Sequence, residues 1–163
     1  MNHLIKPGLM FLIYFVSLTV STAQEVNSEF DSFLEVYTAT WNKHNGDALA
    51  SLYTADADMI MGNLPLITGR EAIGGSWNKY FSQIDQSRKG IFELISLRDI
   101  TPDVRLVNIS SKTFGSNKYG EELETRLARG TWILVKRDEN WLIAAMRGLP
   151  ATGENRLRPG VDH

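Results

Sequence analysis

The side chains that could carry proton-transfer chemistry gather in one stretch, residues 40–63. It contains His44, the only histidine between the N-terminal segment and the last residue, and the carboxylates Asp56 and Asp58. Such groups act as general bases when they lie within hydrogen-bond reach of a substrate proton. They also have structural interpretations, because histidine is common at helix C-termini and aspartate in turns and at exposed strand starts. The sequence leaves His44 and Asp58 as candidate catalytic residues and favours a turn role for Asp56.

A third candidate is Arg147, near the end of an apolar stretch, residues 140–149, that is predicted to be a strand. Alternation along a strand places Arg147 on the same face as Trp141 and Ile143. A charge on an apolar face is costly without a partner. Arg147 is therefore predicted either to bind a carboxylate or phosphate oxygen of a ligand, or to pair with an internal Asp or Glu.

Other polar residues interrupt predicted strands. Asn108 breaks an apolar alternation and is predicted to be a buried polar group that lines a pocket. Arg126 and Arg129 fall on opposite faces of their strand, so at most one of them faces inward.

Several chemistries lack a signature. The chain has no cysteine, which excludes disulfides and thiol catalysis. The serines of "GGSW" and "SSK" are not in a G-x-S-x-G elbow, and no glycine-rich phosphate loop follows a strand. One histidine with scattered carboxylates is a weak metal site. The net charge is −2 and the basic residues are scattered, which argues against nucleic acid. No metal and no cofactor are predicted.

The N-terminus has the pattern of an export signal. Lys6 precedes an apolar run, Gly8–Val20, and small residues stand at Ser21 and Ala23. The alternative is a membrane anchor, but the run is shorter than the ~20 residues that span a bilayer. We therefore predict a signal peptide at 1–23, export to the periplasm or medium, no stable membrane insertion after cleavage, one domain at 24–150, and a C-terminal tail at 151–163.

Hydrophobic periodicity predicts helices first and strands afterwards. Helical spacing runs from Val26 to Trp41, and "HNGD" ends that helix. A short helix and a strand at 55–63 follow, and then a helix that a T-x-x-E capping box at Thr68 and Glu71 would open. Four strands are predicted at 91–100, 103–115, 124–137 and 140–149. This order indicates an α+β fold.

The phrases "WNKHNGDALASLYTADADMI", "ITGREAI", "LRDITPDVRLV" and "TWILVKRDENWLIAA" occur in this order. In these phrases the chain resembles the SnoaL-like superfamily with the nuclear transport factor two fold, and most of all its SgcJ/EcaC-type branch. The resemblance implies a curved antiparallel sheet wrapped around a long N-terminal helix, a cystatin-like cone with a mostly apolar pocket at its open end. Relatives include ketosteroid isomerase, scytalone dehydratase, polyketide cyclases, and members that only bind ligands or partners.

Isomerases of this superfamily carry a carboxylate base at the end of the first strand, and the resemblance aligns Met61 with that position. Methionine cannot take a proton, so the sequence does not support the ketosteroid-isomerase mechanism.

The predicted function is binding of a small apolar or aromatic molecule by a homodimer, with cofactor-independent isomerase, dehydratase or cyclase chemistry as its enzymatic form. The alternative is a non-catalytic ligand-binding or protein-interaction module. The predicted pocket consists of Tyr37, Trp41, Tyr53, Met59, Met61, Trp77, Phe81, Asn108, Trp132 and Arg147.

Overall fold

The computed structural model describes residues 28–151. The predicted signal peptide and nearly all of the predicted tail lie outside these residues, so cleavage and export stay predictions. Two compact units divide the chain, residues 1–33 and 34–163. Of the first unit the structure describes the helical residues 28–33, where the rings of Phe30 and Phe33 stack with their centroids 6.2 Å apart. Within residues 28–151 no helix is long and apolar enough to cross a membrane.

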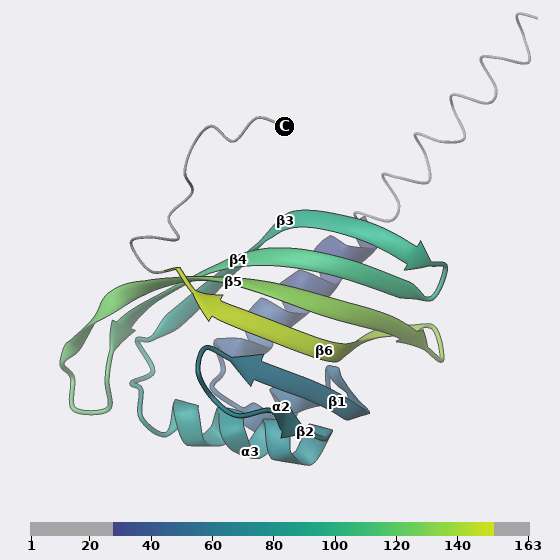
Figure 1. The fold of residues 1–163 in the computed structure, drawn as a ribbon. Helices are drawn as coiled ribbons and strands as arrows, with labels where there is room; N and C mark the ends of the chain where they lie inside the picture. Colours follow the sequence, from purple (N-terminus) through teal and green to yellow (C-terminus); the bar gives the residue numbers. More distant parts are fainter. Residues whose placement is uncertain (1–27, 152–163) are drawn as a thin grey trace, which may run out of the picture. The chain divides into compact units, whose positions relative to one another are not determined.

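The second unit is built on one curved six-stranded sheet with the order β2-β1-β6-β5-β4-β3 (Figure 1). Neighbouring strands are antiparallel except β1 and β6, which pair in parallel. The α+β prediction is confirmed, and the four late strands lie close to their predicted bounds. The strands are β1 (Tyr53–Met61), β2 (Ile67–Thr68), β3 (Lys89–Thr101), β4 (Val104–Ser116), β5 (Glu122–Arg137) and β6 (Asn140–Pro150).

The helices of this unit lie on one side of the sheet (Figure 1). They are the end of the first helix, which spans residues 28–41, and the helices α2 (Gly46–Ala50) and α3 (Arg70–Phe81). Their apolar residues are buried at the predicted helical spacing, Tyr37 and Trp41 on the first helix and Ile73 and Trp77 on α3. We call the sheet face toward these helices the inner face and the opposite face the outer face.

The start of α3 differs from its prediction. Thr68 belongs to β2, where it pairs with Asp58, and Gly69 takes the N-cap position without a side chain to cap the helix. Arg70 instead fastens this end of the helix to the sheet, because its Nε donates to the carbonyl of Tyr53 at 2.8 Å. The predicted capping box is therefore wrong: strand pairing with β1 uses Thr68 before the helix begins.

A β-bulge in β6 decides which side chains face inward. Ile133 pairs with Ala145 and Leu134 pairs with Ile143, so Ala144 is an extra residue in β6. One extra residue exchanges the two faces of a strand. Buried Trp141 and Ile143 precede the bulge and buried Met146 follows it, so Arg147 faces outward. The prediction that Arg147 shares a face with Trp141 is wrong for this reason.

Candidate functional site

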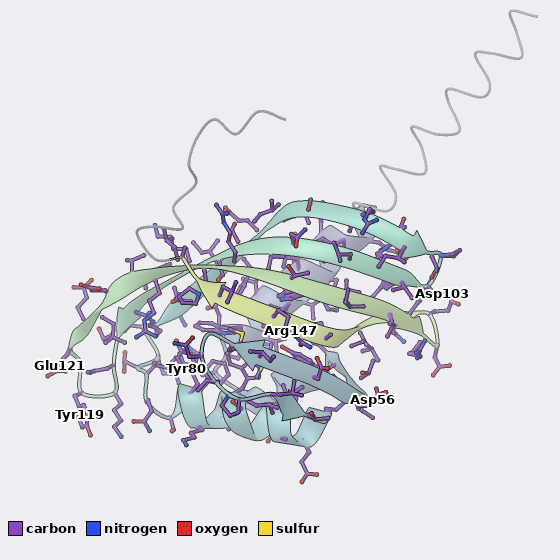
Figure 2. All side chains as sticks on the ribbon, viewed as in Figure 1. Asp56, Tyr80, Asp103, Tyr119, Glu121 and Arg147 are labelled. Atoms are coloured by element: carbon purple, nitrogen blue, oxygen red, sulfur yellow. The ribbon has the colours of Figure 1, made fainter. Side chains whose placement is uncertain are left out.

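A cavity of about 430 Å³ lies between the inner face of the sheet and the helices. Its size is within the ~300–1,000 Å³ typical of small-molecule sites. Figure 2 shows Tyr80, one of the lining residues, in the layer between α3 and the sheet. The lining consists of Trp41, Met59, Met61, Gly62, Leu64, Ser76, Trp77, Tyr80, Phe92, Ser111, Thr113, Arg126, Leu127, Ala128, Gly148, Leu149 and Pro150.

Aromatic rings form the helix side of the cavity. Trp41 contacts Phe92 of β3 edge-on, with the centroids 5.8 Å apart, and Trp77 contacts Tyr80 in the same way at 6.1 Å. These rings come from three elements, because the first helix, α3 and β3 each direct one or two of them to the same space. Offset and edge-to-face contacts of this kind hold rings in fixed positions. The cavity therefore has rigid apolar walls that suit a flat or ring-bearing molecule.

Met61, at the end of β1, lies in the cavity lining. It occupies the position at which the resemblance to isomerases implies a catalytic carboxylate. It is paired with Gly148 of β6, and a Cβ at position 148 would lie only 2.6 Å from the Met61 sulfur. Glycine at 148 is thus what leaves room for the thioether. A thioether offers apolar, polarisable contact to a ligand and no proton-transfer capacity.

The opposite wall is polar and comes from the β4–β5 pair. Ser111 and Thr113 lie on the inner face of β4, and Thr113 pairs directly with Arg126 of β5. Side chains directly opposite each other on one face of such a pair have Cβ atoms about 5 Å apart. Arg126 is exposed, is the one charged residue of the lining, and has no hydrogen bond or ion pair to any residue of 28–151.

A second guanidinium lies behind this wall. Arg88 is 1% exposed, and its Nη2 donates to the hydroxyl of Thr113 at 3.0 Å. Its Nη1 donates to the carbonyls of Gly115 at 3.1 Å and Glu124 at 3.5 Å. All three acceptors are neutral, and no carboxylate of the described residues pairs with Arg88. The polar wall therefore holds a buried positive charge that the fold itself does not balance.

The turn before Arg88 fixes its backbone. Asp85 accepts a hydrogen bond from the N–H of Ser87 at 2.9 Å, and this bond is the main cause that lowers the pKa of Asp85. The carbonyl of Asp85 accepts from the N–H of Arg88 at 2.9 Å. On the other side, Nε2 of His44 donates to the carbonyl of Arg88 at 2.8 Å. His44 lies in the turn after the first helix with a φ of 54°, and its hydrogen bond to the Arg88 carbonyl helps to position Arg88.

Gly115 allows the chain to approach this turn. A Cβ at position 115 would lie 2.5 Å from the carbonyl oxygen of Ser87 and 2.7 Å from the Cα of Arg88, and its φ is 109°. L-amino acids rarely adopt that conformation. Gly115 therefore brings the backbone of β4 against the Asp85–Arg88 turn and offers its own carbonyl to the guanidinium.

Two buried tyrosines, Tyr37 and Tyr53, belong to the core and not to the cavity lining. Burial raises the pKa of Tyr37 well above its usual value, and the neighbouring Tyr53 adds to this shift. Burial likewise raises the pKa of Tyr53, whose hydroxyl donates to the sulfur of Met146 at 3.3 Å. Tyr37 packs on Trp132 with ring centroids 4.6 Å apart. Both phenols stay protonated at neutral pH and act as neutral parts of the core.

The structure separates the predicted pocket residues into three groups. Trp41, Met59, Met61 and Trp77 line the cavity. Tyr37, Tyr53, Phe81 and Trp132 are buried in the core outside the lining. Asn108 and Arg147 lie on the outer face, away from the cavity.

Asn108 faces outward because its neighbours Val107 and Ile109 are the buried residues of β4. Its amide donates to the hydroxyl of Ser96 at 3.0 Å and accepts from the hydroxyl of Thr131 at 2.7 Å. The prediction that Asn108 is a buried pocket residue is therefore wrong. It belongs to a polar row that crosses three strands.

The candidate acid–base residues do not meet in the cavity. Asp58 and Arg147 form an ion pair on the outer face, with Nη1 2.5 Å from Oδ1. His44 stacks on Phe81 with ring centroids 5.2 Å apart and is absent from the lining. Asp56 is exposed, and the nearby Thr54 hydroxyl is the main cause that lowers its pKa. Figure 2 shows Asp56 near the start of β1, far from Tyr80. No group of three His, Asp or Glu side chains within residues 28–151 is placed to hold a metal ion.

Sequence reasoning missed most of the polar wall. Arg126 was one of two arginines on opposite faces of their strand, and alternation alone could not choose between them. Arg88 lies outside every predicted strand, so no periodic pattern drew attention to it. Thr113 is ordinary in a strand. Its significance comes from the register that places it between two guanidinium groups.

The family of the chain follows from a comparison with known domains. The model of the SnoaL-like domain matches residues 31–148, and the chain belongs to this family. Among curated proteins, no sequence matches the chain significantly.

Solved structures similar to this one include proteins described as cystatin-like and as nuclear transport factor two-like. A protein from Novosphingobium aromaticivorans proposed to be a scytalone dehydratase is 13% identical, with a TM-score of 0.69 over 82% of this chain and 89% of that chain. A ketosteroid isomerase-like protein from Erwinia carotovora atroseptica is 15% identical, with a TM-score of 0.66 over 77% and 95%. A proposed calcium/calmodulin dependent protein kinase II association domain from Xanthomonas campestris is 22% identical, with a TM-score of 0.64 over 78% and 86%. At these identities the likeness concerns the fold.

Proposed function

We propose that this SnoaL-like domain binds a small apolar or ring-bearing molecule in the cavity, without catalysing its conversion. The cavity of about 430 Å³, walled by two tryptophans, a tyrosine, a phenylalanine and two methionines, carries this proposal. Apolar pockets with a few placed polar groups are the usual form of small-molecule sites. Within the family we further propose the SgcJ/EcaC-type branch, on the sequence phrases that resemble it.

Binding is favoured over proton-transfer catalysis by the composition of the lining. It contains no carboxylate, imidazole or amine among the described residues, and its titratable groups are Tyr80 and Arg126. Isomerisation or dehydration needs a base within hydrogen-bond reach of the substrate. Asp58, a predicted base, faces away from the cavity and is paired with Arg147.

The test is calorimetric titration of the purified protein with naphthalene-2-carboxamide, a neutral flat probe. Ser111 lies in the lining and its neighbour Ser110 faces outward, so the two serines form a matched pair. We expect Ser111→Phe, which places a ring in the cavity, to weaken binding at least about tenfold, and Ser110→Phe to leave it unchanged. Equal effects of both variants, or absence of wild-type binding to this probe and to its charged analogues, would contradict the proposal.

We also propose a homodimer formed through the outer face of the sheet. Ile91 of β3 and Lys112 of β4 are directly opposite each other in the register, on the outer face. Ile91 is 44% exposed, and large exposed apolar side chains on a sheet face favour association. Sedimentation equilibrium should give a dimer for the wild type and for Val36→Glu on the first helix, and a monomer for Ile91→Glu. A monomeric wild type would exclude the proposed homodimer.

A further inference from the structure

We infer that the ligand is an organic carboxylate, with its apolar body among the rings and its carboxylate against the β4–β5 wall. This inference rests on the proposed function and adds the charge of the ligand and the residues that recognise it. Arg126 would bind the carboxylate directly, the hydroxyl of Thr113 would donate to it, and Arg88 would act through Thr113.

The charge balance of the wall carries the inference. Arg88, behind the wall, donates to neutral oxygens only, while Arg126, exposed in the lining, has no hydrogen bond or ion pair within residues 28–151, and the described lining contains no carboxylate. Guanidinium groups remain charged in proteins, and burying a charge without a counter-charge is costly. Arg88 is almost completely buried and its Nε has no partner within residues 28–151. An anion in the cavity would supply the missing counter-charge to both groups.

The hydrogen bond between Arg88 and Thr113 determines how the Thr113 hydroxyl can bond to a ligand. The Thr113 oxygen accepts from Nη2 of Arg88, so its own O–H proton is left to donate elsewhere. A hydroxyl has one proton and can accept and donate at once. Since Thr113 lines the cavity, that proton is available to a ligand oxygen, and a ligand that can only accept fits it best. Arg88 is thus a positioning residue.

The number of donors favours a carboxylate over a phosphate. Arg126 offers one planar fork and Thr113 one hydroxyl, while Ser111 two residues before it adds a second hydroxyl. A carboxylate has two oxygens in the plane of such a fork. Its two oxygens offer about four acceptor sites, which two N–H groups and two hydroxyls fill, whereas the three terminal oxygens of a phosphate monoester offer more acceptor sites than this wall has donors. The apolar remainder of the lining requires that the carboxylate be attached to an aromatic or other apolar body.

The experiment compares naphthalene-2-carboxylate with naphthalene-2-carboxamide at pH 7, where the first is an anion and the second a neutral molecule of the same shape. The proteins are the wild type, Arg126→Met, and the matched control Arg129→Met. Arg129 is on the same strand, is also exposed, and faces outward opposite Ser110. We expect the wild type and Arg129→Met to bind the carboxylate at least about tenfold more tightly than the amide, as a charge-assisted bond requires. Arg126→Met should bind both probes with the affinity of the amide.

Four outcomes separate this inference from the proposed function. Loss of the carboxylate preference in Arg126→Met alone, together with a wild-type affinity for the carboxylate that falls as salt is added, supports the inference. Equal wild-type affinity for the two probes overturns it and leaves the proposed function standing. Tighter binding of 2-naphthyl phosphate than of the carboxylate overturns the assignment of the anion. Binding of none of the three probes overturns the inference and the proposed function together.

Discussion

Two buried arginines have different partners: Arg105 near the start of β4, and Arg88, which lies in the turn before β3 and contacts the end of β4. Arg105 is 4% exposed, and its Nε donates to the carboxylate of Asp99 at 2.9 Å. Its guanidinium also lies 4.0 Å from the ring centroid of Trp141. Arg88 is 1% exposed and donates only to neutral oxygens.

The difference shows at which end of the core the buried positive charge has a counter-charge. At the Arg105 end, a carboxylate and an aromatic face balance the charge, as is usual for buried guanidinium groups. At the Arg88 end, residues 28–151 provide hydrogen bonds to the guanidinium but no carboxylate that pairs with it, and this end contains the cavity. A balanced buried charge is part of the structure. An unbalanced one beside a cavity indicates a ligand of opposite charge.

The largest expected effect is at the contact that keeps Arg88 in place. Gly115→Ala forces a Cβ to within 2.5 Å of the Ser87 carbonyl in a backbone conformation with φ 109°. Clash and backbone strain together should lower the free energy of unfolding by about 3 kcal/mol or more. Urea unfolding followed by circular dichroism measures the change.

Two other glycines distinguish the effect of steric clash from that of backbone strain. Gly120 has a φ of 81° but open space around it, and Gly75 has neither a positive φ nor a close neighbour. We expect Gly120→Ala to cost about 1 kcal/mol through strain alone, and Gly75→Ala to be neutral or stabilising because it lies within α3. Equal losses at Gly115 and Gly120 would show that the approach to Arg88 is not tight.

The core between the two arginines is neutral, and alkaline pH tests it. The folded-state pKa values of Tyr37 and Tyr53 are raised, so the unfolded chain loses these two protons first as pH rises above about 10. The free energy of unfolding keeps its full value below that pH. Above it, this free energy falls by about 1.4 kcal/mol per pH unit for each phenol. Urea unfolding at pH 9, 10 and 11 should show this decrease in the free energy of unfolding. In Tyr37→Phe the decrease should be smaller by the contribution of one phenol.

The exposed Tyr119 provides the control for that experiment. Tyr119→Phe removes a phenol that is 77% exposed and leaves the buried pair intact, so the slope of the wild type should be retained. A wild-type stability that does not change between pH 9 and 11 would mean that water reaches Tyr37 and Tyr53.

A smaller effect is expected at the balanced end. Asp99→Asn leaves Arg105 with Trp141 but without its carboxylate, which makes it resemble Arg88. A hydrogen bond between charged groups is worth about 1.5–3 kcal/mol, and the 44% exposure of the Asp99 side chain reduces this to about 1–2 kcal/mol. Asp103→Asn in the same hairpin changes the net charge equally and should have no effect. Equal losses in the two variants would make the pairing with Asp99 irrelevant.

The order of elements was predictable because it depends on local patterns. Helical and alternating periodicity are properties of neighbouring residues, and they predicted α3 and the late strands within a few residues. The parallel pairing of β1 with β6 was not predictable in this way. It joins segments about 90 residues apart, and neither segment shows which partner it takes.

The site was harder to predict because it depends on register. Alternation is reliable only along an unbroken strand, and the extra residue Ala144 reversed the face of Arg147. No local signal marks that bulge. Arg88 and Thr113 are 25 residues apart, and each is unremarkable until the β4–β5 register and the Asp85–Arg88 turn bring them together.

The smallest expected effect is at the arginine that the sequence favoured. Arg147 and Asp58 pair on the outer face with side chains 43% and 35% exposed, so a double-mutant cycle should give a coupling below about 1 kcal/mol that decreases as salt is added. Because Arg147 faces away from the cavity, Arg147→Met should bind naphthalene-2-carboxylate as the wild type does, in contrast to Arg126→Met. If Arg147→Met lost the preference for the carboxylate over the amide, the anion would be recognised on the outer face, and the contrast between the two ends of the core would not locate the ligand.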